Sequence, residues 1–137
     1  MKKIMQIMLF FTLLLVASHV KAQLDTLQYL KKFEVEKAEY INKPFSYLLG
    51  QMTQLQPKTV WFELQINRKS RVRTSFFKFC LMDHSFNKNS ISLNITWQDE
   101  ILYSQIKYYH DLNHFYFTND ERQFYGNKIV KNIEVVR

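Results

Sequence analysis

The strongest pattern in the sequence is a run of apolar residues at helical spacing between Lys43 and Leu55. Its apolar positions recur every three or four residues: Phe45, Leu48, Leu49, Met52 and Leu55. Pro44 suits the first turn of such a helix, because the N–H that proline lacks would have no partner there. Gly50 weakens the helix interior by about 1 kcal/mol relative to alanine, which favours an early end. We therefore predict a helix over 43–55 with one face buried.

A less regular helical pattern precedes this stretch, from Asp25 to Asn42, where charged residues interrupt the apolar stripe. Lys43 comes directly before a proline, and the residue before proline is disfavoured in the helical conformation. We therefore expect a break near Asn42 and Lys43, with a helical segment on each side of it.

From Thr59 onward the apolar period changes from about four to two, which is typical of strands with one buried face. A first strand is predicted over 59–67, a second over 72–82 after a polar turn at 67–71, and a third over 90–97. The alternating apolar positions are Val60, Phe62, Leu64 and Ile66 in the first strand and Ile91, Leu93, Ile95 and Trp97 in the third. The second strand is apolar on both faces, as a central strand would be. The three strands are predicted to form an antiparallel meander.

The last third of the sequence carries weaker patterns. Residues 99–109 fit a helix, with a loop and an edge strand as the alternative. Asn119 or Asp120 is predicted to cap a short helix that runs through Phe124. A final strand is predicted over 128–137, and its apolar residues alternate between two faces: Ile129, Ile133 and Val135 on one, Val130 and Val136 on the other. Together these elements predict an α+β fold, in which N-terminal helical segments pack on an antiparallel sheet of about four strands, a meander plus a C-terminal strand.

The first 22 residues have the features of a secretory signal peptide: Lys2 and Lys3 at the start, an apolar run over 8–16, and a small-residue cleavage site that ends at Ala22. The apolar run is shorter than the roughly 18–20 residues that a membrane-spanning helix needs. We therefore predict export, to the periplasm or out of the cell, and a mature chain over 23–137 that forms a single α+β domain without a transmembrane segment. Removal of the signal peptide takes away three lysines and lowers the formal net charge from +7 to +4.

Composition favours a packed domain over a disordered chain. The sequence has 12 Phe, 8 Tyr and 2 Trp but only 2 Gly and 2 Pro, so core material is abundant and flexible segments are few. Cys80 is the only cysteine, which excludes an internal disulfide and a lipid anchor at the cleavage site. Stability is therefore expected to come from packing, with Cys80 as a small buried apolar group.

The segment Ile41-Asn42-Lys43-Pro44-Phe45-Ser46-Tyr47-Leu48-Leu49, placed after a signal peptide and before a strand meander, resembles a segment of certain small exported bacterial proteins. Those proteins carry (Gly/Asn)-Lys-Pro-Phe-Ser-x-Leu-Leu in the same position. The resemblance implies an exported α+β protein and attaches no activity to it. A more distant likeness, to the β-lactamase-inhibitor-protein-like and cystatin-like folds, implies a helix-plus-sheet arrangement only.

Positive charge is densest in the predicted turn after the first strand, at Arg68, Lys69, Arg71 and Arg73. Such a patch would hold an anionic polymer through charge contacts, or would form a solvated hairpin tip that discourages edge pairing. Trp61 faces away from the predicted buried side of its strand, and this surface is either covered by 102–124 or exposed. The candidate interaction surface therefore consists of Trp61, Phe76, Arg68, Arg71 and Arg73.

No pattern of catalytic or metal-binding residues stands out. His110 and His114 are four apart, a spacing that places both on one side of a helix, but no glutamate follows the first histidine. His84 would join them only through the tertiary fold. No serine lies in a glycine-flanked elbow, and Cys80 falls within a predicted strand. We expect no catalytic residue, no cofactor and no metal.

The sequence therefore predicts an exported, non-catalytic binding or interaction module of unknown partner. One alternative is a small hydrolase or metal-dependent enzyme that uses His84, His110 and His114, and another is a polyanion-binding protein that uses the basic turn at 68–73. The expected partner is an envelope protein or an anionic polymer, and a nucleic acid is not expected for an exported chain of modest net charge. Histidines that converge in one pocket would favour the enzyme, and scattered histidines would favour the module.

Overall fold

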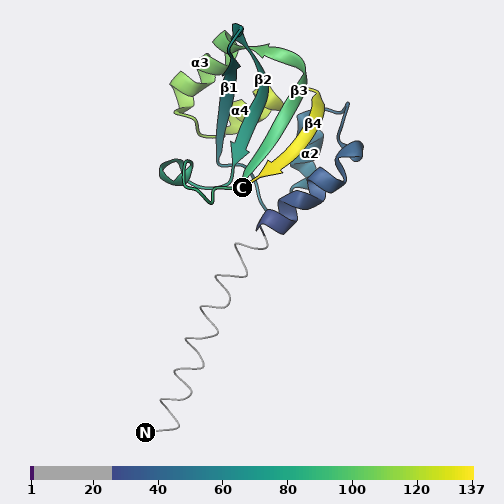
Figure 1. Cartoon of the computed structure of the whole chain (residues 1–137), viewed down its shortest axis with the longest axis vertical. Helices are drawn as coiled ribbons and strands as arrows, with labels where there is room; N and C mark the ends of the chain where they lie inside the picture. The colour runs from purple at the N-terminus through teal and green to yellow at the C-terminus, as the bar shows by residue number, and fades with distance from the viewer. Residues whose placement is uncertain (2–25) are drawn as a thin grey trace.

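The chain folds into one antiparallel sheet with helices packed against it (Figure 1). A computed structural model describes Met1 and residues 26–137, so the rest of the predicted signal peptide over 1–22 lies outside the described residues. Four strands lie in the order β1-β2-β3-β4, which confirms the predicted α+β class and the four-stranded sheet. The strands are β1 (Thr59–Gln65), β2 (Arg68–Lys78), β3 (Ser92–Leu102) and β4 (Val130–Val136).

The helices are short. The first is described over 26–35, and it is followed by η1 (Lys37–Glu39), α2 (Phe45–Gln51), η2 (Met82–His84), α3 (Tyr103–Asn113) and α4 (Asn119–Gly126). In Figure 1, α2 and α4 lie behind the sheet, and α3 lies beside the upper end of β1. A turn in which Asn42 has a φ of 65° separates the first helix from α2, so the expected break is present. Among the described residues, no helix has the length and apolar character needed to cross a membrane.

The apolar face of α2 lies at the centre of the core, as its spacing predicts. Phe45, Leu48 and Leu49 are all buried. The centroid of the Phe45 ring lies 4.6 Å from that of Phe77 on β2 and 5.4 Å from that of Trp97 on β3. Aromatic pairs at these distances stabilise a core beyond their buried area alone. The helix therefore joins the two central strands.

The ends of α2 differ from the predicted 43–55. Pro44 stands at the N-cap in an extended conformation, and its backbone forms a bridge with Ile129. The helix ends at Gln51, directly after Gly50, because glycine is a poor helix former. Leu55 lies outside the helix but still packs against the core.

β2 begins at Arg68, earlier than predicted. Its residues 71–72 gain backbone partners because they pair with 101–102 of β3. The predicted basic turn is therefore wrong: the turn contains only Ile66 and Asn67, and the basic residues stand in a strand. Ile66 is 90% exposed instead of buried, because β1 ends one residue before it.

β3 and β4 also depart from the sequence pattern. Residues 99–102, predicted as part of a helix, close β3, and α3 begins directly after them. Val130 is buried, although simple alternation along β4 predicts that it lies on the other face of the strand from Ile133. A register shift between β3 and β4 pairs Val130 with Trp97, and the extra residue of such a bulge lets Val130 and Ile133 point to the same face.

The cap of α4 is Thr118, not Asn119 or Asp120 as predicted. The Thr118 hydroxyl accepts a hydrogen bond from the Asp120 N–H at 3.2 Å. The Glu121 carboxylate accepts one from the Thr118 N–H at 2.9 Å. This reciprocal pairing is a capping box, which satisfies backbone donors that a helix start leaves free.

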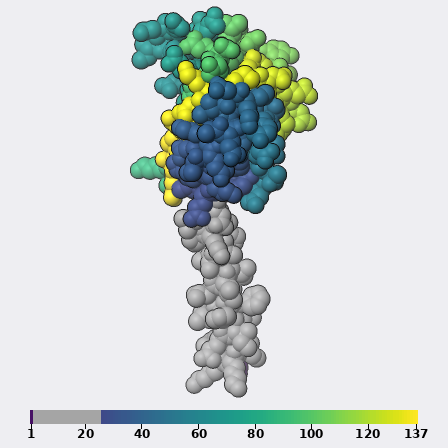
Figure 2. All heavy atoms as spheres, turned by 90° about the vertical axis from the view of Figure 1, so that its right-hand side faces the viewer, coloured from purple at the N-terminus to yellow at the C-terminus, as the bar shows by residue number. Residues whose placement is uncertain are grey.

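The outer edge of β4 is covered by the N-terminal segment, which Figure 2 shows in blue across the yellow strand. Glu34 accepts a hydrogen bond from the Val135 N–H at 2.8 Å, and the Lys31 ammonium donates to the Val135 carbonyl at 3.1 Å. Burial acts to raise the pKa of Glu34, but the hydrogen bonds from Lys31 and Val135 lower it overall. The Asn42 N–H donates to the Val130 carbonyl at 2.8 Å. These contacts occupy backbone groups that would otherwise pair with another chain.

Candidate binding surface

The two faces of the sheet differ in what covers them. On one face, Phe77 and Trp97 contact Phe45 of α2 and Tyr125 of α4. The opposite face is turned to the viewer in Figure 1, and no α-helix of the described chain lies in front of it there. Residues that pair directly across two strands share a face. The pairing therefore places eleven residues on this side, which we call the open face: Thr59, Trp61, Thr74, Phe76, Lys78, Ser92, Asn94, Thr96, Asn132, Glu134 and Val136.

One corner of the open face is aromatic. The Trp61 ring stacks on Phe115 at 4.4 Å and 17°, and it meets the edge of Phe86 at 4.8 Å. Phe86 is 78% exposed. Lys78 holds the loop that carries Phe86, because its ammonium donates to the Ser85 carbonyl and lies over the Phe86 ring at 5.2 Å. The corner is thus built from three segments that are far apart in the sequence.

The centre of the open face is polar, and Glu134, opposite Asn94, adds a carboxylate on its β4 side. The hydroxyls of Thr74 and Thr96 lie 3.3 Å apart across β2 and β3. Asn94 accepts a hydrogen bond from the Ser92 hydroxyl at 2.5 Å. Each of these side chains is held in place by a neighbour and keeps further hydrogen-bonding capacity. The centre therefore offers fixed donors and acceptors next to the aromatic corner.

The basic residues at 68–73 lie at the end of the sheet where the turn joins β1 and β2. Arg68 and Arg73 both reach the carboxylate of Glu100, at 3.4 Å and 3.3 Å. Within the described chain, no ion pair reaches Lys69 or Arg71. Glu100 therefore neutralises part of the positive charge that the sequence places here, and the patch is weaker than four cations suggest.

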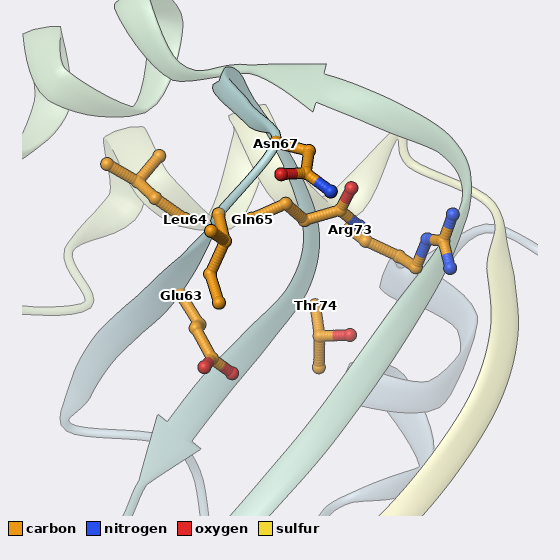
Figure 3. A pocket seen from close by; sticks show the side chains of 7 residues that line it. Glu63, Leu64, Gln65, Asn67, Arg73 and Thr74 are labelled. Atoms are coloured by element: carbon orange, nitrogen blue, oxygen red, sulfur yellow. The ribbon is translucent and has the colours of Figure 1, made fainter.

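A shallow hollow of about 350 Å³ lies beside this end of the sheet, lined by residues 63–67 together with Arg73 and Thr74. Figure 3 shows Gln65 extending from β1 toward Arg73 on β2. The lining mixes a carboxylate, two amides and a guanidinium with the apolar Leu64 and Ile66. It is an open depression at the tip of the β1–β2 hairpin.

The three histidines proposed for an enzyme occupy different surroundings. His110 is buried between aromatic rings, 4.9 Å from Phe62 and 4.3 Å from Phe115. Burial lowers the pKa of His110 below its usual value, and the nearby carboxylates of Glu121 and Asp111 offset only part of that effect. Its Nε2 atom is buried without a hydrogen-bond partner in the described chain. His110 therefore packs as a neutral ring.

His84 and His114 are exposed and stand on different elements. His84 closes η2, where its ring contacts Asp83 at 3.7 Å and Asn87 at 3.1 Å. His114 caps the end of α3 with a φ of 51°. Within residues 26–137, no group of three or more His, Cys, Asp and Glu side chains could hold a metal ion.

Sequence reasoning located part of this surface. Trp61 and Phe76 lie directly opposite each other on the open face, and Arg68 and Arg73 meet at Glu100 near its end. Phe86 was missed, since it is a single aromatic residue in a polar loop and gives no periodic signal. The polar residues at the centre were missed as well, because alternation alone does not distinguish a binding face from an ordinary solvated one.

The chain matches no known protein-family model, and searches of curated proteins and of solved structures found no similar protein.

Proposed function

We propose that this protein is an exported, non-catalytic binding module whose partner docks on the open face of the sheet. The observation that carries the proposal is the contrast between the two faces. One is packed against α2 and α4, and the other carries the half-buried Trp61 and Phe76 together with the 78% exposed Phe86. Exposed aromatic side chains beside polar groups are typical of interaction surfaces.

The rigidity of the aromatic corner supports the same proposal. Trp61 is fixed by its stack on Phe115 and by a hydrogen bond from its Nε1 to the Thr59 hydroxyl at 3.2 Å. A side chain that is already ordered loses little conformational entropy when a partner arrives. The corner is therefore suited to anchor a partner, while the threonine and asparagine side chains supply hydrogen bonds.

The two alternatives have less support. Polyanion binding at residues 68–73 is weakened because Glu100 pairs with Arg68 and Arg73. An enzyme would need its histidines in one cavity, but His110 is packed between rings while His84 and His114 are exposed. The geometry favours binding over both.

A double substitution tests the open face. The protein, secreted with its own leader, is immobilised and its partner is captured from envelope extract and identified. Phe76→Ser with Phe86→Ser is expected to weaken binding of the purified partner at least about tenfold, because aromatic anchors contribute on the order of 1–2 kcal/mol each. Binding is measured by calorimetry.

The matched control removes two exposed apolar side chains from α3, Tyr108 and Leu112. Tyr108→Ser with Leu112→Ser is expected to leave the affinity within about twofold, since α3 lies beside the upper end of β1 and not in front of the open face. Equal affinity for the wild type and the Phe76/Phe86 variant would refute the proposal.

A further inference from the structure

The two edges of the sheet are protected unequally. Glu34, Lys31 and Asn42 occupy backbone groups along β4. On β1, the chain's own segment 115–117 covers only the beginning of the strand. Its Tyr116 forms a bridge with Thr59, its Phe115 carbonyl accepts from the Val60 N–H at 2.9 Å, and its Phe117 N–H donates to the Lys58 carbonyl at 2.9 Å.

The rest of the β1 edge has free backbone groups. The Val60 N–H points away from β2, because it donates to Phe115. Backbone groups of an antiparallel strand alternate between its two sides, and the register shifts between Phe62 and Gln65 place their extra residues on β2, so those of Phe62 and Leu64 in β1 also point outward. Along the described chain, no hydrogen bond reaches these outward groups of Phe62 or Leu64.

We propose that this stretch of β1 binds an extended segment of a partner protein as an additional strand. The inference rests on the proposed function as a binding module and names its partner as a polypeptide. An alternating row of N–H and C=O groups is matched only by another extended main chain. Segment 115–117 already pairs with this edge in that way, so the added strand continues an existing line of pairing beyond Val60.

The surroundings of the edge define the side chains that such a segment would carry. Side chains of an added strand alternate between the two faces of the sheet. On the open-face side they would lie over the hollow, where Gln65 extends toward Arg73 (Figure 3). On the other side they would contact Phe62, whose ring lies 5.4 Å from Tyr103 of α3. The fitting segment therefore alternates polar residues with apolar ones.

A second copy of this chain fits the edge poorly. A symmetric pair of β1 strands that uses Phe62 and Leu64 of both copies has its centre at Glu63. That register places Glu63 opposite Glu63, and like charges directly opposite destabilise a strand pair. A heterologous segment has no such conflict, so the occupant is a partner protein.

The test uses a displayed library of random twelve-residue peptides, selected on the secreted protein. Selected peptides are expected to protect the Phe62 and Leu64 amides from hydrogen exchange. Leu64→Pro is expected to weaken their binding at least tenfold. Proline there removes an N–H that has no partner within the fold, which edge strands tolerate. Val35→Ser serves as the control and should bind the same peptides with unchanged affinity, because Val35 is 81% exposed on the first helix, which lies beside β4 at the other edge of the sheet.

Three outcomes of the peptide experiment would overturn the inference: no peptide is selected, binding survives Leu64→Pro, or protection falls on residues outside β1. If Leu64→Pro does not fold, hydrogen exchange of the wild-type protein with bound peptide still shows whether the Phe62 and Leu64 amides are protected. Hydrogen exchange of the protein without peptide is measured at several protein concentrations. If protection of the Phe62 and Leu64 amides rises with concentration, the edge pairs with a second copy of the chain, and the inference is overturned. The two proposals fail separately. If the edge binds no peptide but the protein still captures its envelope partner through the open face, the proposed function stands and only the edge inference fails.

Discussion

Replacing Phe45 by alanine is expected to lower the free energy of unfolding by about 3–5 kcal/mol, the range for large-to-small changes of a buried aromatic. The Phe45 side chain is fully buried, and its ring contacts both Phe77 and Trp97. Its removal would leave a cavity where α2 meets two central strands, which cannot collapse without moving the sheet. Urea unfolding followed by tryptophan fluorescence measures the change.

Tyr47 provides the control, because it is an aromatic residue on the same helix but is 42% exposed. Tyr47→Ala is expected to cost less than about 1.5 kcal/mol, since partly exposed side chains lose less apolar burial. If both variants lose the same free energy of unfolding, α2 does not pack against the sheet through its Phe45 face.

Replacing Glu121 by alanine is expected to cost about 2–3 kcal/mol, because it leaves buried polar partners unsatisfied. Glu121 is fully buried. Its carboxylate accepts hydrogen bonds from the Thr118 N–H at 2.9 Å, from the Thr118 hydroxyl at 2.5 Å and from the Asn113 amide at 2.9 Å. The substitution therefore breaks the capping box and the link between α3 and α4. Thermal unfolding and urea unfolding both report the loss.

Asp120 is the matched acidic neighbour, since it is exposed and accepts one hydrogen bond from Asn113 at 3.2 Å. Asp120→Ala is expected to cost less than about 1 kcal/mol, the contribution of an exposed acid near a helix start. If the Glu121→Ala protein is as stable as the Asp120→Ala protein, the hydrogen bonds of Glu121 with Thr118 and Asn113 do not stabilise the fold as described. The His110 pKa gives a second readout, because it should fall when the Glu121 charge is removed.

The local pattern predicted those parts of the fold in which alternation and burial agree. Leu93, Ile95 and Trp97 alternate in sequence and are all buried on one face of β3. The helix through Phe45 was likewise visible from its spacing. In both places one face of a regular element meets the core, so a single period describes the element completely.

The errors arise where tertiary contacts override the local pattern. The basic residues after Asn67 were predicted to form a turn, but pairing with 101–102 of β3 draws them into β2. Val130 was placed on the wrong face because a register shift adds a residue to β4. Bulges and strand extensions depend on partners distant in sequence, and no window of a single strand contains that information.

The candidate surface was predicted in part for a similar reason. The outward direction of Trp61 follows from alternation, and Phe76 is its direct neighbour across the strand pair. The contact of Trp61 with Phe86 and Phe115 depends on how two separate loops return to β1. The pairing of Arg68 and Arg73 with Glu100 could not be read from the sequence either, since the residues are 32 and 27 positions away from Glu100.

Exposure of the open face is measured most directly by methyl NMR with a soluble paramagnetic agent. The methyl groups of Thr74 and Thr96 are expected to broaden strongly, because no α-helix of the described chain covers them. The methyl groups of Leu93 and Ile95, buried on the opposite face, are expected to keep their intensity. Equal protection of both pairs would show that the face is covered and would contradict its role as a binding surface.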